Sequence, residues 1–151
     1  MKRLGLVFLL LCGCGPKNAP ALPYAFAVYG DCRRFHKVHA DLCEQMVLGG
    51  ARFVLVSGDL VNHGEESDWV RFREITKDLR SRAAYLPAMG DHDGKLFARE
   101  FGLEKLYYDR VFDDIHVFVL DSTGRFREAD QLAWLEERAA ASRSLHKFAV
   151  F

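Results

Sequence analysis

The spacing of hydrophobic residues changes repeatedly along the chain and predicts an alternation of strands and helices. Short apolar runs typical of strands lie at 24–29, 53–56, 84–88, 106–111, 115–120 and 148–151. Between these runs, apolar residues recur every three or four positions, which is typical of helices. The helices are expected at 36–48, 65–82, near 94–101 and at 128–142. Strand and helix alternate through the first two-thirds of the chain, which favours an α/β layered fold with parallel strand pairing.

The same spacing predicts which faces are buried. The run 53–56 combines aromatic and β-branched residues without interruption, as in a strand buried on both faces. Strands 106–111 and 115–120 flank Asp113-Asp114 and are expected to form a hairpin. The expected core-facing lines on the three longer helices are Val38, Leu42 and Met46, then Trp69, Phe72, Ile75 and Leu79, and then Leu132, Leu135 and Ala139.

Composition narrows the function classes. The chain has 151 residues, of which 50% are hydrophobic and 28% charged, so one globular domain is expected. Lysine and arginine together equal aspartate and glutamate at 21 each. This balance lacks the basic excess of a nucleic-acid-binding face.

The first residues are typical of a targeting segment. Basic Lys2-Arg3 precedes an apolar stretch at 4–12 that is too short to span a bilayer as a mature helix. The following Leu11–Cys14 resembles the bacterial lipobox, which implies a signal peptide at 1–13, lipidation of Cys14 and a lipidated tether at 14–23. An ordinary secretory signal is the alternative. The resemblance places the protein outside the cytoplasm, anchored by lipid to a membrane of the bacterial cell envelope.

Two further cysteines, Cys32 and Cys43, follow the predicted tether. An extracytoplasmic location permits a disulfide between them. Their spacing does not decide between a disulfide and two unpaired thiols.

Three strands of the predicted sheet end in the same pair of residues. These junctions are Gly30-Asp31, Gly58-Asp59 and Gly90-Asp91, and His92 follows the last of them. Parallel strands align their carboxyl ends, where ligands bind in open α/β sheets. Converging carboxylates repel each other unless cations neutralise them. Oxygen ligands beside a histidine suit divalent Mn, Fe, Zn or Mg, so we expect a metal site at this edge.

The order of these motifs resembles that of the calcineurin-like metallophosphoesterase family. Asp31–Arg33, Gly58–Gly64 and Gly90–Asp93 match three of its motifs in sequence order. The resemblance covers 24–151 and corresponds to the amino-terminal part of the family domain. It implies an α-β-β-α sandwich that is truncated at its C-terminal side, because the family's late metal-binding histidines would begin after Phe151.

The resemblance also implies roles for individual residues. Asp31 would bind a first metal, Asp59 would bridge two metals and Asp91 would bind the second. The resemblance implies two divalent metal ions (Mn, Fe or Zn) and a phosphate-ester substrate whose identity the sequence does not reveal. His92 matches the family's catalytic histidine, which acts as a general acid toward the leaving oxygen.

Two positions depart from the family pattern. Arg33 stands where a metal-binding histidine is usual, and a guanidinium cannot bind a metal. It is expected to replace part of an ion's role or to grip a phosphate oxygen, so we count it with the catalytic residues. Asp91 replaces a neutral asparagine. With the late histidines missing as well, metal affinity and activity of this chain are expected to be weak.

The remaining histidines are assigned no chemistry. His36, His39 and His63 are expected to be solvated, and His116 is expected to lie on a sheet surface.

The sequence is compatible in part with two other functions. A degenerate phosphoesterase domain could serve as a non-catalytic envelope lipoprotein used for binding or structure, which Arg33, Asp91 and the early stop favour. A haloacid-dehalogenase-like phosphatase would need a second acid two residues after its aspartyl nucleophile. Asp31 and Asp59 are instead followed at that distance by Arg33 and Val61, which excludes them from this role. Asp91 is followed by Asp93 and meets the spacing, but only in isolation.

Overall fold

The structure is a computed structural model and describes residues 25–123 and 129–151. The predicted signal peptide, the lipidation site Cys14 and the tether lie outside the described residues.

A parallel three-stranded sheet forms the first half of the molecule. Its strands β1 (Ala25–Tyr29), β2 (Ala51–Ser57) and β3 (Ala84–Ala88) lie in that order, with β2 in the centre. Helices α1 (His36–Leu48) and α2 (Glu66–Arg82) make the two crossovers. All four residues of the run at 53–56 are buried in β2, as the unbroken apolar run predicts.

A second three-stranded sheet forms the other half. After the short helix α3 (Phe97–Phe101), the strands β4 (Tyr108–Phe112) and β5 (Ile115–Val119) pair as the predicted antiparallel hairpin. Helix α4 (Ala129–Ala141) then leads to β6 (His146–Val150), which pairs parallel to β5.

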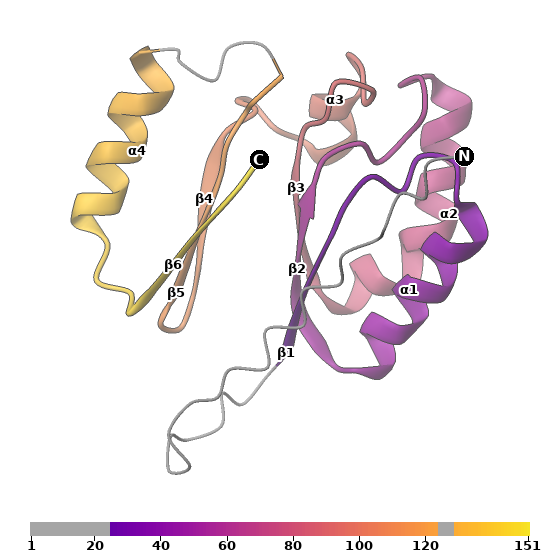
Figure 1. The fold of residues 1–151 in the computed structure, drawn as a ribbon, viewed down its shortest axis with the longest axis horizontal. Coiled ribbons are helices and arrows are strands. Elements are labelled where there is room, and N and C mark those ends of the chain that lie inside the picture. The colour runs from indigo at the N-terminus through magenta and orange to yellow at the C-terminus, as the bar shows by residue number, and fades with distance from the viewer. Residues whose placement is uncertain (1–24, 124–128) are drawn as a thin grey trace, which may run out of the picture.

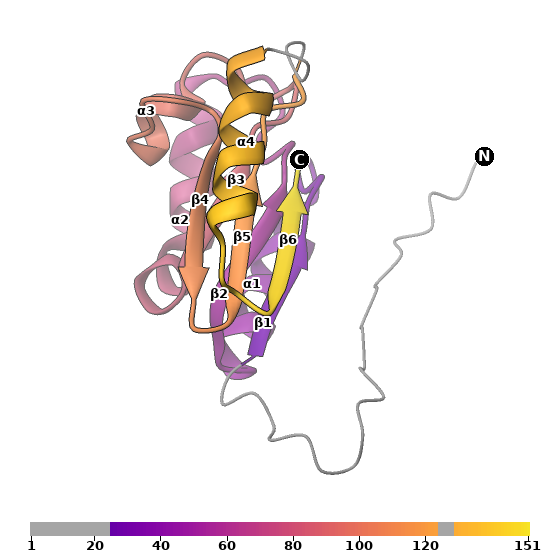
Figure 2. The ribbon, with the colours of Figure 1, turned by 90° about the vertical axis from the view of Figure 1, so that its left-hand side faces the viewer.

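The two sheets pack face to face between two helix layers, which confirms the expected α-β-β-α arrangement (Figure 1). One apolar core lies between α1, α2 and the first sheet, where β2 contributes Val54 and Val56. The other core lies between the sheets, where Phe53 and Leu55 of β2 meet Val117 and other residues of β5. Figure 2 shows α4 over the outer face of the second sheet.

The buried faces of two helices differ from the prediction. Val38 is 47% exposed, and α1 instead buries His39 and Cys43 one position further along. In α4, Leu132 is exposed and Gln131 is buried, because the Gln131 side chain accepts a hydrogen bond from the backbone N–H of Asp121. Polar residues take these positions because they find hydrogen-bond partners inside. In α2, the predicted line is confirmed.

Two histidines expected at the surface are buried. His39 lies on the buried face of α1, with its Nε2 2.9 Å from the Tyr29 hydroxyl. His116 lies on β5, is 4% exposed and reaches Ser142 just after α4. Its Nε2 is 2.7 Å from Asp109 Oδ2 and its Nδ1 is 2.8 Å from Ser142 Oγ. The predictions for His39 and His116 were therefore wrong.

Two questions left open by the sequence are answered for the described residues. Cys32 and Cys43 are both buried and unpaired, so the thiols form no disulfide. Within 25–123 and 129–151, no helix is both long enough and apolar enough to cross a membrane.

Candidate metal centre

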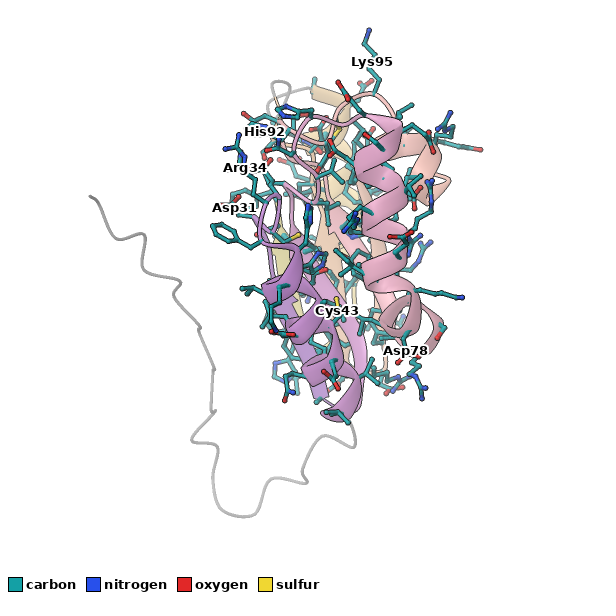
Figure 3. The ribbon with its side chains drawn as sticks, turned by 90° about the vertical axis from the view of Figure 1, so that its right-hand side faces the viewer. Asp31, Arg34, Cys43, Asp78, His92 and Lys95 are labelled. Carbon is teal, nitrogen blue, oxygen red and sulfur yellow. The ribbon has the colours of Figure 1, made fainter. Side chains whose placement is uncertain are left out.

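The loops that follow β1, β2 and β3 meet at one edge of the first sheet. The Asp31 N–H donates to the carbonyl of Gly58 at 3.1 Å, and the Cys32 N–H donates to that of Asp59 at 3.2 Å. Figure 3 shows Asp31 and His92 at the same end of the molecule. The convergence expected from parallel pairing is thus present.

The glycines before the acids are required by close backbone packing. Gly58 has φ +81, and a Cβ there would lie 2.8 Å from Gly90 Cα. A Cβ on Gly90 would lie 2.2 Å from both the backbone nitrogen and Oδ1 of Asp59. Asp31 and Asp59 themselves adopt left-handed backbone angles, with φ 50 and 56, which are uncommon for residues other than glycine. The Gly-Asp pairs therefore let two loops touch directly behind the carboxylates.

Asp59, Asp91 and His92 form a group that could hold a metal ion. One ligand atom from each lies within 4.8 Å of the other two. Two carboxylates and an imidazole suit divalent transition metals such as Mn, Fe and Zn, so the donor set fits one such ion. Asp91 has a side chain that is 81% exposed, so the group opens to solvent.

The orientation of His92 is set by a backbone carbonyl. Its Nδ1 lies 2.9 Å from the Asn62 carbonyl oxygen, which can only accept a hydrogen bond. Nδ1 therefore donates, which leaves Nε2 as the ring nitrogen available to a metal ion or a substrate. Nε2 lies 3.9 Å from Asp91 Oδ1. No side-chain pattern indicates this contact, because a main-chain oxygen accepts the hydrogen bond.

Arg33 lies between two of the carboxylates. Its Nε is 2.8 Å from Asp31 Oδ1 and 3.5 Å from Asp59 Oδ2. Desolvation opposes the charge of Arg33, but the hydrogen bond with Asp31 and the nearby carboxylates outweigh it and raise the pKa of the guanidinium. Asp31 is thus placed beside Arg33 and is not a member of the group formed by Asp59, Asp91 and His92.

Asp93 is a site residue that the sequence reasoning missed. It is fully buried, and its Oδ1 accepts from the N–H groups of Leu60 at 2.7 Å and Val61 at 3.1 Å. Its Oδ2 accepts from the Gly90 N–H at 2.8 Å. Burial raises the pKa of Asp93 to about 6, although these hydrogen bonds oppose the rise. Asp93 therefore fastens the loop after β2 to the loop after β3. In the sequence, only its position at the end of the Gly90–Asp93 motif indicates that Asp93 belongs to the site.

No protein-family model matches the chain, and no curated protein matches it. Among solved structures, it is similar to a purple acid phosphatase isolated from yellow lupin (Lupinus luteus) seeds, with a TM-score of 0.65 and 15% sequence identity. The match covers 76% of this chain and 27% of the lupin chain, so this chain spans about a quarter of that structure's length. The similarity shows that the chain has an α/β fold like part of the purple acid phosphatase structure.

Proposed function

We propose that the chain hydrolyses phosphate esters with the help of a divalent metal ion bound at the carboxyl edge of the first sheet. The observation that carries this proposal is the convergence of Asp59, Asp91 and His92 within 4.8 Å at that edge. The fold similarity to a purple acid phosphatase supports the reaction class.

Each residue contributes a distinct chemical function. A divalent ion bound by Asp59 and Asp91 would polarise a phosphoryl oxygen and lower the pKa of a bound water. Arg33 presents a fixed positive charge to the phosphate oxygens. His92 has Nε2 on the side of the carboxylates, because Nδ1 is held by the Asn62 carbonyl. From there it either completes the ligand set or donates a proton to the leaving oxygen.

Substitution of His92 separates these two roles. In His92→Asn, loss of Mn²⁺ binding identifies a ligand. Retained binding with loss of turnover identifies a proton donor.

The test of the function is phosphate release from an aryl phosphate in the presence of Mn²⁺. We expect turnover that stops on chelation and falls about 100-fold or more in Asp59→Asn. Asp41→Asn is the matched control, because Asp41 is exposed on α1 and pairs with the exposed Lys37. Equal activity of Asp59→Asn and the parent chain would contradict the proposal.

A non-catalytic role is the second candidate. It is favoured by Arg33, which lies within 3.5 Å of both Asp31 and Asp59 and offsets their repulsion without any metal. This candidate predicts a folded chain that neither turns over aryl phosphates nor gains thermal stability from Mn²⁺. Turnover that depends on Asp59 rules it out.

We propose further that the protein is a lipoprotein anchored through Cys14 to a membrane of the bacterial cell envelope. The lipobox-like Leu11–Cys14 supports this location. In a bacterial host, radiolabelled palmitate should enter the full chain and should not enter Cys14→Ala. Labelling of Cys14→Ala at the parent level would contradict the proposal.

A further inference from the structure

We propose that Arg33 takes the place of a second metal ion, so that the site binds one divalent ion, and that Asp31 positions Arg33 instead of binding metal. This inference rests on the metal-dependent function proposed above.

The first argument is the position of the guanidinium. Nε of Arg33 lies 2.8 Å from an oxygen of Asp31 and 3.5 Å from an oxygen of Asp59. An ion bridging Asp31 and Asp59 would need the space that Nε fills, beside a cation that cannot lose its proton. The donor set therefore fits one ion, at Asp59, Asp91 and His92.

The second argument is the charge of the edge. Three carboxylates, those of Asp31, Asp59 and Asp91, face one guanidinium, that of Arg33, which leaves two negative charges. Asp93, buried behind the loops, adds one negative charge, and Arg34, beside Asn62, adds one positive charge, so the balance is unchanged. One divalent ion neutralises the edge. A second would leave two uncompensated positive charges, which like-charge repulsion disfavours.

The third argument is which guanidinium nitrogen of Arg33 forms its ion pairs. Both of its ion pairs are formed through Nε. Its side chain is 29% exposed, so it is reachable from solvent. The two terminal nitrogens of a guanidinium held in this way form a fork that matches two oxygens of a phosphate. Asp31 thus anchors Arg33 at its inner nitrogen and leaves the fork to face an anionic substrate.

The test is the number of Mn²⁺ ions bound per chain, measured by equilibrium dialysis and elemental analysis. We expect one ion for the parent chain and one for Arg33→Lys, which keeps the positive charge. Arg33→His removes the fixed charge, supplies an imidazole beside Asp31 and should raise the number to two. Arg34→His is the matched control, because Arg34 bonds to the amide oxygen of Asn62 and to neither carboxylate, and it should stay at one.

The outcomes separate this inference from the function on which it rests. Two ions in the parent chain, or one ion in Arg33→His, would overturn the role of Arg33 and leave a metal-dependent hydrolase intact. No bound Mn²⁺ in any of the four proteins would overturn the proposed function and this inference with it.

A second readout uses inorganic phosphate as the probe. In calorimetric titrations of the Mn²⁺-loaded chain, Arg33→Lys should weaken phosphate binding about tenfold, because an ammonium lacks the bidentate fork. Arg34→Lys should bind phosphate as the parent does. Unchanged binding in Arg33→Lys would contradict the assignment of the fork to phosphate.

Discussion

At the residue scale, the candidate centre depends on a backbone contact that only glycine allows. Gly90 lies against Asp59 so closely that an added Cβ would be 2.2 Å from its backbone nitrogen and Oδ1. Gly90→Ala must therefore push the loop after β3 away from Asp59 and separate the ligand atoms. We expect Mn²⁺ affinity to fall about tenfold or more while the fold persists, as measured by titration and circular dichroism.

Gly50→Ala is the control for this substitution. Gly50 has φ +67, and a Cβ there would meet no atom within 4 Å, so only backbone strain is introduced. That variant should bind Mn²⁺ as the parent does. Parent-like affinity in Gly90→Ala would contradict the account of the loop contact.

Asp93 is the residue on which loop stability depends most. Its carboxylate accepts hydrogen bonds from the N–H groups of Leu60 and Val61, which are buried, and of Gly90, which is partly buried. Asp93→Ala leaves these donors unpaired and should lower the free energy of unfolding by about 3 kcal/mol in urea denaturation. Asp93→Asn should cost less, because its carbonyl oxygen still serves the first two donors.

The control for Asp93 is Asp78→Ala in α2. Asp78 is exposed and pairs with Arg82 one turn away, so its loss should cost less than about 0.5 kcal/mol. Equal effects of Asp93→Ala and Asp78→Ala would show that the buried carboxylate does not fasten the two loops.

At the element scale, the spacing of apolar residues predicted the elements well and their faces less well. The bounds of α1 and β3 agree with prediction, and the other bounds differ by a few residues. The buried face of α1 is displaced by one position because His39 reaches Tyr29. A hydrophobic pattern treats histidine as polar and solvated. It therefore does not predict a hydrogen-bond partner that lies on a distant element of the fold. The burial of His116 was missed for the same reason.

His39 makes folding sensitive to acid. Burial first, and then the charge of His36, lower the pKa of His39 to about 4. The unfolded chain binds a proton here below about pH 6.5, whereas the folded chain does so only near pH 4. The contribution of neutral His39 to the free energy of unfolding is thus fully present above pH 6.5. It is lost as the pH falls toward 4, by up to about 3 kcal/mol.

Comparison of variants isolates this effect. The free energy of unfolding should fall less between pH 7 and pH 4 in His39→Gln than in the parent. His63→Gln, which alters an exposed histidine, should keep the parent slope. Asp93, with its raised pKa, titrates in the same range with the opposite sign, but its contribution is common to all three proteins. A parent-like slope in His39→Gln would contradict this origin of acid sensitivity.

At the scale of the whole molecule, parallel pairing gathers the acids. The sequence predicted the convergence of three strand ends, because alternation of strands and helices implies parallel order. It did not predict which carboxylates pair with Arg33 and which join His92 in the candidate metal group. Asp31 pairs with Arg33, whereas Asp59 and Asp91 join His92. That division depends on side-chain directions after each turn, which short-range sequence patterns do not determine.

One experiment tests the proposed roles of the five site residues together, namely Asp31, Arg33, Asp59, Asp91 and His92. The measurement is anomalous X-ray diffraction from crystals of the chain soaked in Mn²⁺. We predict one anomalous peak per chain, bonded to oxygens of Asp59 and Asp91, with Arg33 still beside Asp31. Mn²⁺-loaded crystals with no peak at the carboxyl edge of the first sheet would contradict the central claim that this edge is a metal centre.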